Sequence, residues 1–112
     1  MKRIFRLIVV LFFVFACESD KKQYTKLDSK KTNIDFVNKL YETNTRNYFT
    51  YPYMYLGGGV AAGDFNNDGL EDLFFTGNMV SNKLYLNLGD FNFKDISEFA
   101  GIAGDNRWYS GV

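Results

Sequence analysis

The stretch "GDFNNDGLED", residues 63 to 72, places an acidic or amide side chain at every second position and then turns on a glycine. Alternate positions of a tight loop point toward a common centre, and Gly69 permits the sharp turn that follows. All the donors are hard oxygens, which suits calcium better than zinc or copper. The pattern therefore predicts a Ca²⁺ site made by Asp64, Asn66, Asp68, the backbone carbonyl of Leu70, and Asp72.

The same loop could also be an EF-hand or a polar turn without an ion. An EF-hand needs a bidentate glutamate at its twelfth position, which is Phe75 when Asp64 is the first, so the EF-hand is excluded. A polar turn without an ion is the remaining alternative, because Asn-Asp-Gly favours turns. Asp72 is not needed by such a turn and therefore favours calcium. Phe65 and Leu70 are expected to point away from the ion, into the sheet.

On both sides of the loop, four short apolar segments alternate with turn signals rich in Gly and Asn. Closely spaced segments of this kind are typical of antiparallel all-β structure. Four strands in about fifty residues also match one blade of a β-propeller. The expected fold is therefore all-β, with one four-stranded antiparallel blade whose strands lie within residues 59–65, 72–77, 83–89 and 93–97.

A weak internal repeat extends this interpretation. The pair Gly59-Val60 before the acidic loop returns as Gly111-Val112, an offset of 52 residues (111 − 59), which is near the period of propeller repeats. We therefore expect a blade over residues 59–107 and the truncated start of a second repeat at 108–112, so that the propeller is incomplete. One four-stranded blade cannot bury both of its faces, so the chain alone is expected to be marginally stable at best.

The region before the blade, residues 32–58, is expected to be an N-terminal extended segment. Apolar residues at mixed spacing over residues 34–42 suggest a strand that runs into a short helix. Residues 47–59 are rich in aromatic side chains, and Pro52 disfavours a central strand there. Such an aromatic run could stack on carbohydrate or could pack an N-terminal strand onto the domain.

The N-terminus has the features of an export signal. Residues 1–16 combine three basic residues with an unbroken apolar run that is much shorter than the roughly 20 residues of a transmembrane helix. The following "VFAC" resembles the lipobox of bacterial lipoproteins, which implies cleavage before Cys17 and lipidation of that cysteine. The alternatives are an ordinary secretory signal with an incidental cysteine, or a short buried helix. Residues 17–31 are charged and are expected to form a flexible tether.

Composition excludes several function classes. The formal net charge is zero, and becomes −3 without the signal, because three basic residues leave 10 against 13 acidic ones. We therefore expect no nucleic-acid partner. The sequence has no histidine, and its single cysteine cannot form an internal disulfide. Glu71 and Asp72 are neighbours that point to opposite sides of a strand, so they do not make a catalytic carboxylate pair.

The segments "DFNNDGLEDLFF" and "NKLYLNLGDFNFKDIS", with the "AG" that follows, resemble a repeat of the FG-GAP/VCBS type. These are integrin-α-like β-propeller blades with a calcium loop, and the resemblance covers about residues 32–112. It is similar in particular to N-terminal parts of long bacterial lipoproteins that often carry an ASPIC/UnbV domain further on. The resemblance implies calcium at the five loop residues, and a propeller used for adhesion or ligand binding.

The expected function is therefore that of a non-catalytic, calcium-binding propeller repeat in a cell-envelope lipoprotein. It would be held at the bacterial outer membrane by lipidated Cys17, at the periplasmic or the outer surface, and would bind an extracellular protein or glycan. Two alternatives stay open. The chain could be a non-catalytic part of a larger extracellular enzyme such as a glycan-degrading hydrolase or lyase, or a spacer that calcium makes rigid.

Overall fold

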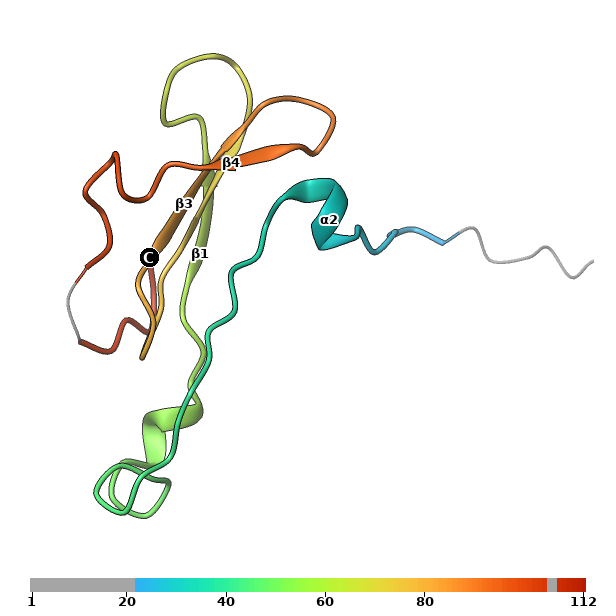
Figure 1. Ribbon diagram of the computed structural model, residues 1–112. Coiled ribbons are helices and arrows are strands. Elements are labelled where there is room, and N and C mark those ends of the chain that lie inside the picture. The colour runs from blue at the N-terminus through green and yellow to red at the C-terminus, as the bar shows by residue number, and fades with distance from the viewer. Residues whose placement is uncertain (1–21, 105–106) are drawn as a thin grey trace, which may run out of the picture.

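The computed structural model describes residues 22–104 and 107–112 (Figure 1). The predicted signal peptide and Cys17 lie outside these residues. The described elements are the helix α2 (Ser29–Thr32), the 3-10 helix η1 (Pro52–Tyr55), and the strands β1 (Val60–Gly63), β2 (Asp72–Phe75), β3 (Lys83–Asn87) and β4 (Phe93–Asp95).

The two helices are single turns. α2 is capped at its start by Asp28, whose side chain accepts a hydrogen bond from the backbone N–H of Lys30 at 2.8 Å, and at its end by Asn33, which has a positive φ of 57°. The polar stretch that was predicted to be a tether therefore ends in one capped helical turn. Within the described residues, no helix has the length and apolar character that crossing a membrane requires.

The strands form one sheet in the order β1-β2-β3-β4, and each neighbouring pair is antiparallel. Each strand lies inside one of the four apolar segments, so the expected all-β fold with one four-stranded antiparallel sheet is confirmed. Tyr85 in β3 lies opposite Leu73 in β2 and Asp95 in β4. This register places Tyr85 at the centre of the sheet.

The core lies on the face of the sheet that carries Tyr85, which is fully buried. Its ring meets the ring of Phe75 edge-on, with centroids 5.8 Å apart. Phe75 in turn stacks on Phe36 at 5.1 Å. One aromatic column therefore joins β3, β2 and the region before the blade.

Residues 33–41, here called the N-terminal segment, run across this face without joining the sheet (Figure 1). Asn33 bonds Asn92 in the β3–β4 turn, while Asn38 accepts a hydrogen bond from the backbone N–H of Asn78 beyond β2. The prediction of a strand followed by a short helix is wrong here, because side chains rather than paired backbone groups hold the segment. Its even-numbered residues from 34 to 40 are half-buried and its odd-numbered residues are exposed, as expected for extended backbone.

The end of the chain returns to the start of the blade. The hydroxyl of Thr76 accepts a hydrogen bond from the N–H of Gly59 at 2.6 Å, and it lies 3.4 Å from the carbonyls of both Gly59 and Gly111, to either of which it can donate. A Cβ on Gly59 would lie 2.7 Å from the carbonyl carbon of Gly111 and 2.8 Å from the backbone nitrogen of Val112, so only glycine allows this approach. The two positions that are offset by 52 residues therefore lie side by side.

Candidate functional site

The acidic loop joins β1 to β2 and closes on its own backbone. Asp64 accepts hydrogen bonds from the N–H groups of Asp68 and Gly69, at 3.0 and 2.8 Å. Asn67 and Gly69 both have positive φ, 61° and 86°. These left-handed residues turn the chain around the Asp64 carboxylate, as the Asn-Asp-Gly sequence predicts.

Asn66 and Asp68 form a second set of hydrogen bonds within this loop. Asn66 Oδ1 accepts from the N–H of Asp68 at 3.1 Å, and its Nδ2 donates to Asp68 Oδ2 at 2.7 Å. The other oxygen of Asp68 accepts from the N–H of Leu70 at 2.8 Å. The structure thus brings Asp64, Asn66 and Asp68 together in one hydrogen-bonded loop.

Asp72 lies at the base of the loop and is fully buried. Its Oδ2 accepts from the N–H of Phe65 at 3.0 Å, and its Oδ1 accepts from the N–H of Asn87 at 2.8 Å. One carboxylate therefore ties the first residues of the loop to the end of β3. A buried carboxylate with two N–H donors satisfies the rule that buried charge must be hydrogen-bonded.

The donor types of the loop suit a hard cation, because each carboxylate oxygen keeps a further lone pair after accepting one N–H. However, across residues 22–104 and 107–112 no three His, Cys, Asp or Glu side chains converge closely enough to hold a metal. The carboxylates bind backbone N–H groups of the loop and of β3 instead. The oxygen donors are thus of the type that calcium prefers, but in this structure they hold the loop closed through its own N–H groups.

The two apolar residues of the loop lie differently from the prediction. Phe65 is 56% exposed and Leu70 is 38% exposed, so neither packs into the sheet. The loop extends past the last paired residues, Gly63 and Asp72, and its apolar side chains find little to pack against there. The expectation that both point into the blade is wrong.

Sequence reasoning missed Asn87, the partner of Asp72. Besides its N–H bond, its side chain donates to the carbonyl of Glu71 at 2.9 Å and accepts from the N–H of Gly89. Asn87 thus fixes both the loop base and the following turn. Asparagine is depleted in strands, so its position at the end of an apolar segment was the signal that could have revealed it.

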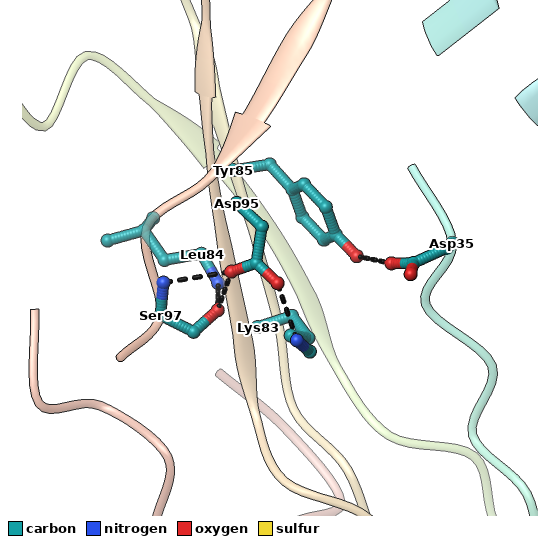
Figure 2. Close-up of polar contacts among 6 residues, drawn as sticks. All are labelled: Asp35, Lys83, Leu84, Tyr85, Asp95 and Ser97. Carbon is teal, nitrogen blue, oxygen red and sulfur yellow. Dashed lines mark hydrogen bonds and ion pairs between the residues drawn. The ribbon is translucent and has the colours of Figure 1, made fainter. Parts of the chain in front are cut away.

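A second polar cluster lies where β3 meets β4 (Figure 2). Lys83 forms an ion pair with Asp95, and Ser97 donates its hydroxyl to the same carboxylate. Ser97 Oγ also accepts from the N–H of Leu84 at 2.9 Å. Burial alone would raise the pKa of Asp95, but the hydrogen bonds from Lys83 and Ser97 outweigh it and lower that pKa. Asp95 is thereby held ionised as a structural acceptor.

Figure 2 also shows the polar contact between the sheet and the N-terminal segment. The hydroxyl of Tyr85 donates to Asp35 Oδ1 at 2.7 Å. Burial raises the pKa of Tyr85, and the hydrogen bond to Asp35 raises it further, so the hydroxyl stays a donor. The N-terminal segment is thus joined to β3 by a polar bond beside the aromatic column.

The aromatic run before β1 divides into two roles. Met54 of η1 is fully buried, whereas Tyr48, Phe49, Tyr53 and Tyr55 are exposed. Tyr51 contacts Trp108, with ring centroids 5.2 Å apart at 53°. The run therefore both packs against the blade and leaves aromatic rings at the surface.

A comparison with protein families matches residues 64–112 to the FG-GAP-like repeat. The match starts at the first residue of the acidic loop and includes β2, β3 and β4. No curated protein and no solved structure matched the chain. FG-GAP repeats are structural or binding repeats rather than a catalytic family. The four-stranded antiparallel sheet agrees with a single blade of this kind, so residues 64–112 of this chain form an FG-GAP-like repeat, a repeat of the β-propeller type.

Proposed function

We propose that this chain is a calcium-stabilised propeller repeat of a bacterial cell-envelope lipoprotein, and that it serves adhesion or the binding of a protein or glycan. The acidic loop carries this proposal. Its oxygens come from Asp64, Asn66 and Asp68 within five residues, and Asp72 links the loop to the sheet. A divalent ion would offset the mutual repulsion of the loop carboxylates, and Leu70 would add its backbone carbonyl.

The return of the chain to Gly59 supports a propeller arrangement. Blades of a propeller surround a central channel, so the start of one repeat is expected beside the start of the next. The contact of Gly59 with Gly111, with Thr76 bonded to both, supports this arrangement. A binding surface built from loops of several blades is the usual use of such an array.

Calcium is expected to raise the melting temperature of the full chain, kept in mild detergent. At a calcium concentration about 100 times Kd the stabilisation would be about 2.7 kcal/mol, which is roughly 10 °C or more for a domain of this size. Asp68→Ala should abolish the increase, because it removes one ligand of the ion. The measurement is a thermal melt followed by circular dichroism, with EDTA and with millimolar calcium.

Glu71→Ala is the matched control for that melt, since it removes an exposed carboxylate beside the loop that is not a proposed ligand. It should keep the full response to calcium. Magnesium at the same concentration should give a smaller shift, because it demands a tighter octahedral site. A wild-type chain that melts at one temperature with and without calcium would refute the site.

Lipid attachment at Cys17 is expected when the full chain is expressed in a bacterium and labelled with an alkyne fatty acid. Cys17 is the only cysteine of the sequence, so Cys17→Ala should lose all label and move the chain from the membrane fraction to the soluble fraction. Moving the thiol by two residues, as Cys17→Ala with Ser19→Cys, should not restore labelling, because the cysteine no longer ends the lipobox. Equal labelling of this double variant would point to nonspecific thiol acylation and contradict the assignment.

A further inference from the structure

A small pocket lies at the end of the sheet opposite the acidic loop. It has a volume of about 170 Å³, below the roughly 300–1,000 Å³ of pockets for drug-sized molecules, so it has room for one small ring. Three stretches that are distant in sequence form its wall, and the lining residues that the structure describes are uncharged: Tyr51, Tyr53, Leu56, Asn78, Trp108 and Ser110.

Aromatic rings dominate the wall. Tyr51 contacts Trp108 at 5.2 Å and Tyr53 at 6.1 Å, at interplanar angles of 53° and 69°. The rings therefore present both faces and edges, and Tyr53 is 64% exposed. Apolar ring surface left open beside a hollow is suited to a ligand that is itself partly apolar.

Asn78 is the lining residue of this pocket with a buried polar side chain. Asn78 is only 4% exposed, and its Nδ2 donates to the carbonyl of Leu56 at 2.9 Å. That bond fixes the orientation of the amide, so Oδ1 is left as an acceptor, and among the residues that the structure describes Oδ1 has no hydrogen-bond partner. Buried acceptors of proteins are nearly always paired, so a hydrogen-bond donor from a ligand would satisfy this oxygen.

We propose that the pocket binds one ring of a saccharide, whose apolar C–H face lies on the aromatic rings while a hydroxyl donates to Asn78 Oδ1. This deepens the proposed binding function and rests on it. A neutral ring that carries both a C–H face and hydroxyl donors matches an uncharged aromatic wall with one unpaired acceptor. Because Oδ1 is covered, binding has to rearrange the pocket wall, and Trp108 belongs to that wall.

Trp108 is the only tryptophan of the sequence, so its emission reports this pocket directly. The full chain in mild detergent with calcium is titrated with cellohexaose, laminarihexaose, mannohexaose and N-acetylchitohexaose. At least one should change the emission saturably. Tyr53→Ala and Asn78→Leu should each weaken that binding by about tenfold or more, since the first removes stacking surface and the second removes the acceptor.

Phe49→Ala is the matched control, because Phe49 is an almost fully exposed aromatic residue of the same run that does not line the pocket. It should bind like the wild type. Tyr53→Ala removes a largely exposed ring and should leave the fold intact, so its effect separates binding from folding. Emission that no saccharide changes, or equal weakening by Phe49→Ala and Tyr53→Ala, would overturn the proposal. So would a Tyr53-dependent response to a proline-rich peptide alone. The calcium response of the melting temperature would survive each of these failures.

Discussion

Asp72→Ala should destabilise the chain by about 2–4 kcal/mol even in EDTA. The variant deprives the N–H groups of Phe65 and Asn87 of their acceptor in two part-buried hydrogen bonds, and each such group left unsatisfied costs roughly 1–2 kcal/mol. Relief from burying a carboxylate offsets part of this cost. Urea unfolding of the full chain in EDTA, followed by circular dichroism, measures the loss without any contribution from calcium.

The neighbouring variant Glu71→Ala provides the comparison for Asp72→Ala. Glu71 is exposed, so its loss should change the free energy of unfolding by no more than about 0.5 kcal/mol. The contrary result is that Asp72→Ala and the wild type have the same free energy of unfolding in EDTA and differ only when calcium is present. Asp72 would then act as an ion ligand alone. The role of Asp72 as the acceptor that ties the loop to β3 would then be wrong.

Tyr85→Ala should cost about 3–5 kcal/mol, the range for removing a large buried aromatic side chain. Tyr85 is fully buried at the centre of the sheet and contacts Phe75, which stacks on Phe36. The cavity would therefore loosen the sheet and the N-terminal segment together. In the same urea assay the transition midpoint should fall sharply, or the variant should be unfolded without urea.

Tyr85→Phe separates the ring from its hydroxyl. It keeps the aromatic column and loses only the bond to Asp35, so its cost should be about 0.5–1.5 kcal/mol. Asp35→Asn should be similarly mild, because Asp35 is exposed and water can replace the lost partner. A Tyr85→Phe cost as large as that of Tyr85→Ala would place the stabilisation in the hydroxyl rather than in ring packing.

The sheet could be predicted because its information is local. Each strand follows its neighbour across a turn that is marked by Gly and Asn, and apolar segments set the strand positions. The loop was predictable in its residue types for the same reason. The hydrogen bonds of the loop were less predictable, because one of the two N–H groups that donate to Asp72 belongs to Asn87, fifteen residues away.

The N-terminal segment shows where local patterns fail. Its apolar residues at mixed spacing fit both a strand and a helix, whereas the structure has extended backbone held by contacts that span about forty residues or more, from Phe36 to Phe75 and from Asn38 to Asn78. The local sequence does not identify the partners of such long-range contacts. Asn78 was missed as a pocket residue for the same reason, since Leu56 and Trp108 reach it from other parts of the chain.

The meeting of Gly59 with Gly111 has a consequence for the order of folding. The β1–β2, β2–β3 and β3–β4 hairpins close short loops and can form early. Joining two glycines that are 52 residues apart carries a length-dependent entropy cost of roughly 3.5 kcal/mol. Most of that cost is removed once the hairpins have shortened the chain path between Gly59 and Gly111. The contact of these two glycines with Thr76 is therefore expected to form last. In the proposed propeller, this late contact would then set the time at which the chain can accept a neighbouring repeat.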